Sequence, residues 1–153
     1  MGECVFMAKI IIASGYFDPV HIGHIKYLNM AKALGDRLIV IVNNDRQTMN
    51  KKGMIFQTES DRIGIIQNLK SVDETQLSID EDPSVCKTIS FICEKYSEDE
   101  IIFAKGGDRI LSNIPEAEIC IEKGITIVDG LGEKIRSSSE LVAKYTKGYH
   151  ELV

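Results

Sequence analysis

Long apolar runs, paired cysteines and an excess of positive charge are absent from this sequence. No apolar run approaches the roughly 18 to 20 residues that span a bilayer, so we expect no membrane segment and no membrane partner. The four cysteines form no CxxC pair and lack the close spacing of a zinc knuckle, so we expect free thiols and no metal site in a cytoplasmic protein. The formal net charge of −5 argues against a nucleic-acid partner, which needs a basic face.

Targeting signals are missing as well. The first eight residues have neither the basic start nor the long apolar stretch of a secretory signal, and residues 1–7 are expected to form a disordered leader. The composition is otherwise that of a globular protein, with 44% hydrophobic and 27% charged residues. At 153 residues the chain fits one domain, 1–153, so we expect one functional site.

Short β-branched runs alternate along the chain with stretches of helical periodicity. Strands are expected at 9–13, 38–42, 72–79, 100–104 and 125–128, and helices at 22–34, 58–70, 82–93, 115–123 and 137–145. This alternation predicts a Rossmann-like three-layer α/β sandwich with a five-stranded, mostly parallel sheet. Ligands bind such sheets beyond the carboxyl ends of the strands, so the loops after Ala13, Val42, Ala104 and Val128 should meet at one crevice.

Two of the three histidines lie three residues apart around a glycine, at the start of the first expected helix. Side chains at this spacing project to the same side, next to the unpaired backbone N–H groups and the positive end of the helix dipole. His21 and His24 are therefore candidates for an anion site, with Gly15 allowing close backbone approach and Gly23 leaving room for a bulky ligand. A structural pair, in which His21 caps the helix and His24 is packed, is the alternative.

Residues 15–24 (GYFDPVHIGH) resemble the G-x-F-D-x-x-H-x-G-H signature of the cytidylyltransferase-like nucleotidyltransferases. The resemblance implies that a nucleoside monophosphate moves from an NTP to a phosphorylated small molecule, with release of pyrophosphate. A phosphate monoester is already ionised and needs no protein nucleophile, so the protein contributes mainly electrostatics. The resemblance gives this catalytic role to His21 and His24 and implies Mg²⁺ bound with the triphosphate.

Further motifs narrow the resemblance to the heptose 1-phosphate nucleotidyltransferase branch over about residues 8–143. They are the segments 105–108 (KGGD), 35–45 (GDRLIVIVNND), 61–62 (DR) and 71–74 (SVDE). Members of that branch transfer AMP from ATP to a sugar 1-phosphate, whereas close relatives transfer CMP from CTP to glycerol 3-phosphate or phosphoethanolamine. The resemblance favours AMP and a sugar phosphate acceptor, and it implies a homodimer.

The other candidate residues are expected around the phosphates. In the expected loop 50–53, Lys51 and Lys52 place cations over them, with Lys52 in a catalytic role and Met49 where the branch has a lysine. Segment 105–108 forms a ligand loop or an ordinary tight turn, and 135–139 (IRSSS) places hydroxyls at a helix N-terminus that suits a triphosphate.

The resemblance and the motif positions together assign the binding residues. Asp18 and Arg62 have a second interpretation, in which each orders a loop. The residues expected to bind the nucleotide are Gly15, Tyr16, Phe17, Asp18, Gly23, Lys105, Gly106, Asp108, Arg136, Ser137, Ser138 and Ser139, and those expected to bind the acceptor are Lys51, Arg62 and Arg109.

Two other functions stay open. The first is a cytidylyltransferase, or an adenylyltransferase acting on pantetheine phosphate or nicotinamide mononucleotide. The second is a nucleotide-binding regulator without turnover, suggested by Met49. A hydride-transfer enzyme is disfavoured because G-x-G-x-x-G does not follow the first strand.

Overall fold

A computed structural model describes residues 7–106 and 114–131. Several predictions fall outside these ranges. They concern the leader 1–6, the closing helix 137–145 and the site residues Asp108, Arg109, Arg136, Ser137, Ser138 and Ser139.

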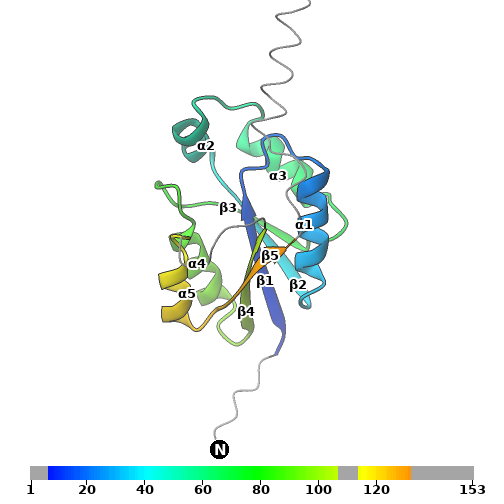
Figure 1. The fold of residues 1–153 in the computed structure, drawn as a ribbon, viewed down its shortest axis with the longest axis vertical. Helices are drawn as coiled ribbons and strands as arrows, with labels where there is room; N and C mark the ends of the chain where they lie inside the picture. Colours follow the sequence, from blue (N-terminus) through cyan, green and yellow to red (C-terminus); the bar gives the residue numbers. More distant parts are fainter. Residues whose placement is uncertain (1–6, 107–113, 132–153) are drawn as a thin grey trace, which may run out of the picture.

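The sheet has five parallel strands in the order β3-β2-β1-β4-β5 (Figure 1). Their bounds are Lys9–Gly15 for β1, Arg37–Val42 for β2, Glu74–Leu77 for β3, Glu100–Gly106 for β4 and Thr126–Leu131 for β5. The predicted strands and their parallel pairing are confirmed. All carboxyl ends therefore lie along one edge of the sheet, where the segments after β1 and β2 begin.

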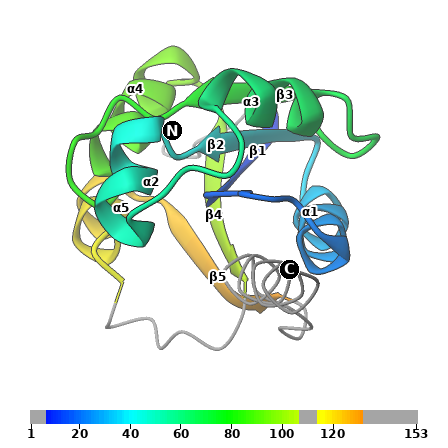
Figure 2. The same cartoon turned by 90° about the horizontal axis from the view of Figure 1, so that it is seen from above.

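Helices cover both faces of the sheet and complete the predicted three-layer sandwich (Figure 2). One face packs against α1 (Ile22–Lys32) and α3 (Glu59–Gln67), the other against α4 (Cys86–Lys95) and α5 (Ala117–Lys123). In β1, Ile10 and Ile12 belong to the α4/α5 core while Ile11 and Ala13 belong to the α1/α3 core. Both faces of this central strand are buried, which explains its continuous apolar sequence.

One helix was not predicted. Helix α2 (Asp45–Lys52) covers the segment that we expected to be a loop at 50–53. Its sequence, DRQTMNKK, has no apolar periodicity, so the usual helix signal is missing. The local signals are the caps: the Asn44 side chain accepts from the Gln47 N–H, and Gly53 ends the helix at φ 76°.

Two predicted helices begin later than expected. Helix α4 starts at Cys86 rather than at Asp82, and α5 at Ala117 rather than at Pro115. The N-cap position of α4 is Val85, which has no side-chain oxygen. The buried carboxylate of Asp80 takes its place by accepting from the N–H groups of Lys87 and Thr88.

The described cysteines, Cys86, Cys93 and Cys120, are free thiols, as predicted. Burial raises the pKa of the Cys120 thiol to about 12 and also raises the pKa of Cys86 and Cys93. These groups are therefore held as thiols rather than thiolates. Within the described ranges, no helix combines the length and the apolar character needed to cross a membrane.

Candidate active site

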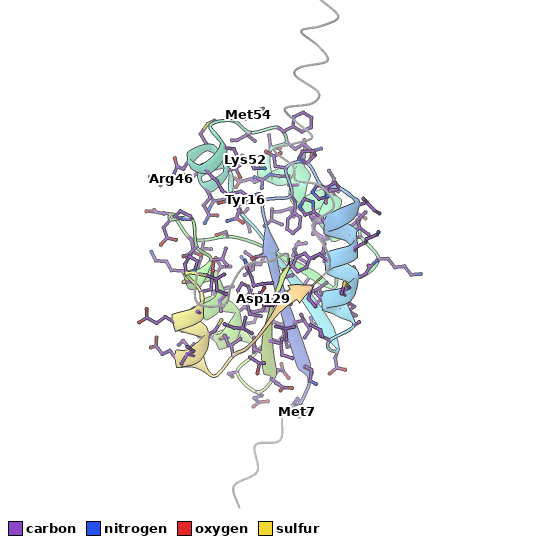
Figure 3. All side chains as sticks on the ribbon, viewed as in Figure 1. Met7, Tyr16, Arg46, Lys52, Met54 and Asp129 are labelled. Carbon is purple, nitrogen blue, oxygen red and sulfur yellow. The ribbon has the colours of Figure 1, made fainter. Side chains whose placement is uncertain are left out.

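The candidate site lies at the carboxyl end of β1, where residues 16–21 lead into α1. Tyr16 and Lys52 lie at this end of the molecule, with Met54 beyond them and Met7 at the opposite end (Figure 3). The fold thus brings the signature segment and the C-terminal half of α2 together.

The two histidines form a reciprocal cap at the start of α1. His21 is the N-cap residue, and its Nδ1 accepts from the Gly23 N–H at 3.1 Å. His24 lies one turn on, and its Nδ1 accepts from the His21 N–H at 3.1 Å. A neutral imidazole that accepts at Nδ1 carries its proton at Nε2. The capping geometry therefore sets the same tautomer in both rings, with Nε2–H as the donor.

The rings are stacked, and the environment of His24 disfavours positive charge. Their centroids are 3.8 Å apart, with 24° between the ring planes, and Phe17 meets His24 edge-on at 5.0 Å. Burial, His21 and the ammonium of Lys52 lower the pKa of His24 to about 3. His24 is therefore a neutral donor throughout the ordinary pH range. The capping role that we considered as an alternative is present together with this donor geometry.

The backbone before the histidines adopts an uncommon conformation. Phe17 has φ 53°, in the left-handed region that bulky residues rarely occupy, and its ring is 1% exposed. A Cβ on Gly15 would approach the Phe17 ring to 2.9 Å. The glycine is therefore needed to pack Phe17, a reason that the sequence did not reveal.

Asp18 is committed to internal contacts. Its carboxylate is buried and accepts from the Phe56 N–H at 2.9 Å and from the Gln57 N–H at 2.6 Å. Its backbone carbonyl accepts from Lys52 Nζ at 3.1 Å. Of the two interpretations of Asp18, the structure favours the one in which it orders the loop, because both carboxylate oxygens already have amide partners.

Arg62 is also committed to internal contacts, so of its two interpretations the structure favours the one in which it holds the loop. Its side chain is fully buried. The guanidinium donates to the carbonyls of Gln57 at 3.0 Å, Tyr16 at 2.8 Å and Asn43 at 2.6 Å, and it pairs with Asp45 at 2.8 Å. The fork geometry of arginine thus joins the loops after β1 and β2 to the start of α3. A phosphate contact would require an exposed guanidinium, and this guanidinium is fully buried.

Two ammonium groups gather at the Tyr16 ring. Lys51 Nζ lies 4.7 Å and Lys52 Nζ 5.7 Å from the ring centroid. Burial lowers the pKa of Lys52, with the neighbouring charges of Lys51 and Arg62 acting in the same direction and Asp18 opposing them. The chain therefore brings two lysines to the site although position 49 is methionine, whose side chain is 47% exposed.

Lys105 and Gly106 are the last residues of β4 rather than part of a turn. Lys105 Nζ lies 5.3 Å from the centroid of Phe103, a residue of the α4/α5 core. Gly106 faces α1 instead, where a Cβ would come within 3.0 Å of the Tyr27 ring. The Tyr27 hydroxyl donates to the Ala104 carbonyl at 2.5 Å and so ties α1 to the end of β4.

Sequence reasoning missed Tyr27, Asn43 and Asp45 as parts of this site. Asp45 and Glu59 cap each other's helices, because each backbone N–H donates to the other's carboxylate. An acidic residue at each helix start was the available signal. The pairing itself depends on the sheet, which brings α2 and α3 together.

Comparison with known proteins agrees with this geometry. The model of the cytidylyltransferase-like family matches residues 12–141. The chain is 33% identical over 150 residues to the bifunctional protein HldE of Citrifermentans bemidjiense, covering 92% of this chain but only 28% of that protein. It is 33% identical over 143 residues to the FAD synthase of Methanocorpusculum labreanum, covering 88% of this chain and 93% of that protein.

A solved structure resembles the chain as well. It is the lipopolysaccharide core biosynthesis protein of Thermoplasma volcanium, at 30% identity and a TM-score of 0.62, covering 82% of this chain and 98% of that one. The likeness therefore extends over nearly the whole of a solved protein.

Proposed function

Because this chain belongs to the cytidylyltransferase-like family and is a nucleotidyltransferase, we propose that it transfers AMP from ATP to a phosphomonoester and releases pyrophosphate. The family resemblance and the reaction class predicted from residues 15–24 are confirmed. The nucleotide and the acceptor belong to the proposal.

The histidine cap is the observation that carries this proposal. In the reaction, an oxygen of the acceptor phosphate forms a bond to the α-phosphorus while the bond to the leaving pyrophosphate breaks. Negative charge grows on the α-phosphoryl oxygens and on pyrophosphate, but no proton needs to move. The Nε2–H groups set by the cap at His21 and His24 suit this task, because neutral donors stabilise the charge without becoming bases.

The lysines at Tyr16 support the same reaction. Lys51 and Lys52 come from the C-terminal turn of α2 and bring positive charge to the loop that leads into the histidines. Such charge attracts phosphates and offsets the repulsion between two anionic substrates. Lys51 and Lys52 thus supply positive charge at the site although Met49 stands where the branch has a lysine. This weakens the case for a regulator without turnover.

Mg²⁺ is expected with the nucleotide, where it neutralises part of the triphosphate charge. Asp18 is the acidic residue of the signature segment, but its carboxylate oxygens are occupied by two amides. We therefore expect the phosphate oxygens, rather than this carboxylate, to hold the ion.

Adenylyl transfer is supported by the likeness to HldE and to the FAD synthase. A sugar phosphate remains the acceptor that the sequence predicts. Flavin mononucleotide is a second candidate acceptor. It is favoured because the alignment spans 93% of the length of the FAD synthase but 28% of that of HldE. The homodimer and the cytoplasmic location implied by the sequence stay predictions.

Pyrophosphate release tests the proposal. ATP and CTP are each offered with ribose 5-phosphate, glycerol 3-phosphate, phosphoethanolamine, phosphopantetheine and flavin mononucleotide. We expect turnover with ATP and at least one acceptor. Turnover with CTP alone would contradict the adenylyl assignment, and nucleotide binding without any turnover would favour the regulator.

A further inference from the structure

Two exposed apolar side chains follow Lys51 and Lys52 along the chain. Met54 is 43% and Phe56 46% exposed, and both belong to the loop that joins α2 to α3. We call these two side chains the apolar rim. Met54 lies beyond Lys52 at the end of the molecule that carries Tyr16 (Figure 3). Large apolar groups that stay exposed next to a polar site are a common mark of a ligand surface.

The rim is held in a fixed position. The Phe56 and Gln57 N–H groups donate to the buried carboxylate of Asp18, and the Gln57 carbonyl accepts from Arg62 Nε at 3.0 Å. These buried partners anchor the backbone while the Phe56 side chain stays 46% exposed. The anchored backbone reduces the conformational entropy that this loop loses when a ligand binds.

Lys52 and the backbone of Phe56 both contact Asp18. Lys52 Nζ lies 3.1 Å from the Asp18 carbonyl, and the Phe56 nitrogen lies 2.9 Å from the Asp18 carboxylate. A phosphomonoester that places its phosphate at the ammonium groups thus has its organic part within reach of the rim. Thioether and phenyl groups cannot satisfy a row of hydroxyls, but they do pack against a flat ring.

We propose that Met54 and Phe56 form the subsite for the organic part of the acceptor, and that this part is a planar aromatic ring system rather than a hydroxyl-rich sugar. The proposal rests on the proposed function, whose acceptor it specifies. The occupant also carries a phosphate, because the rim borders two lysines whose positive charge complements it. Flavin mononucleotide has the required chemistry and serves as the probe, with ribose 5-phosphate as the acceptor that lacks the ring.

The chain offers matched controls for both residues. Phe56→Ala is compared with Phe91→Ala on α4, a phenylalanine that is also 46% exposed, and Met54→Ala with Met30→Ala on α1, a methionine that is also 43% exposed. The kcat and KM for each acceptor are measured by pyrophosphate release at saturating ATP. We expect Phe56→Ala to raise the KM for flavin mononucleotide about tenfold, the change typical of losing one aromatic contact.

The KM values for the other substrates distinguish the loss of an acceptor subsite from a general loss of activity. The KM for ATP and for ribose 5-phosphate should stay within about twofold in Phe56→Ala, as expected of a surface substitution that leaves the fold intact. Phe56→Leu keeps the bulk without the ring and should fall between Phe56→Ala and the unmodified protein. Phe91→Ala and Met30→Ala should change nothing.

Several results would overturn the proposal. An unchanged KM for flavin mononucleotide in Phe56→Ala, or an equal rise for both acceptors, would show that the rim does not recognise a ring. Loss of a dimer in Phe56→Ala, with acceptor constants unchanged, would show that a second copy covers the rim. Turnover of ribose 5-phosphate but not of flavin mononucleotide would sink this inference alone, whereas no turnover with any acceptor would sink the proposed function too.

Discussion

Two polar regions lie at the carboxyl edge of the sheet, and they are built differently. In the region after β2 and β3, polar groups bond to one another: Asn44 Nδ2 donates to the carbonyls of Ser78 and Asp80, and Gln47 Nε2 to those of Asp82 and Ser84. In the region around Tyr16, the residue that follows β1, Lys51 and Lys52 of α2 gather near a histidine pair.

The difference shows how a structural cluster is told from a ligand site. A network that satisfies its own donors and acceptors stabilises the fold. A group of like charges does the opposite, because the charges repel, and it is retained where an anionic ligand offsets the repulsion. We therefore expect substitutions in the bonded network of Asn44 and Gln47 to lower stability, and those around Tyr16 and the histidines to lower turnover.

Arg62 belongs to both regions and should show the largest effect. Its guanidinium bonds to the Tyr16 carbonyl on one side and to the Asn43 carbonyl on the other. Arg62→Ala leaves these buried groups and Asp45 without their partner, so we expect the free energy of unfolding to fall by about 3 to 5 kcal/mol. Urea denaturation measures this loss. Arg46, exposed and paired with Glu81, is the control, and Arg46→Ala should cost less than about 1 kcal/mol.

His24 should separate turnover from stability. Asparagine can still accept from the His21 N–H but lacks a donor at the position of Nε2. We expect His24→Asn to lower kcat at least about a hundredfold, or about 2.7 kcal/mol in the barrier, a loss typical of one preorganised donor. Steady-state pyrophosphate release checks this. A kcat within about threefold of the unmodified protein would remove the histidine from the mechanism.

A substitution at Asp80 should lower stability and leave turnover nearly unchanged, the opposite of His24. Its carboxylate accepts from the Thr88 N–H, the Thr88 hydroxyl and the Lys87 N–H at the start of α4. Asp80→Ala should lower the free energy of unfolding by about 2 kcal/mol and leave kcat within about twofold. A loss of kcat as large as that of His24→Asn, at unchanged stability, would break the distinction between the regions. Asp82→Ala, at an exposed neighbouring carboxylate, is the milder control.

A further expected effect is a pH dependence of stability that comes from His24. The unfolded side chain binds a proton below about pH 6.5, whereas the folded one, with a pKa of about 3, does not. The unfolded state therefore gains protons first, and stability falls as the pH drops from 6.5 toward 3. The slope is at most about 1.4 kcal/mol per pH unit. Denaturation at about pH 7, 6 and 5 should show a shallower slope for His24→Asn, and equal slopes would contradict it.

The sequence predicted the parts of the molecule that depend on local pattern. Continuous β-branched runs predicted the strands, and the spacing of His21 and His24 predicted that their side chains project to the same side, where the rings are stacked. Helix α2 was missed because Met49 is the single apolar residue in its short sequence, which leaves no apolar periodicity. The roles of Asp18 and Arg62 could not be derived, because their partners at residues 56–57 and 43–45 come near only after the sheet has formed.

Gly15 shows the same limit on a smaller scale. A phosphate approach was a sound expectation for a glycine after the first strand, but the ring that excludes a Cβ there belongs to Phe17, two residues further on. Phe17 itself has a left-handed backbone, with φ 53°. Local sequence indicated that a side chain was excluded, but not which group excluded it.

We propose that a backbone cap holds His21 and His24 as neutral Nε2–H donors for catalysis. Nitrogen-15 NMR of the histidine rings tests it most directly, because the ring nitrogens report both tautomer and charge. We expect His24 to carry its proton on Nε2 and to show no titration between about pH 8 and 5, since its pKa is about 3. A proton on Nδ1, or a titration near the ordinary histidine pKa of about 6.5, would contradict the account.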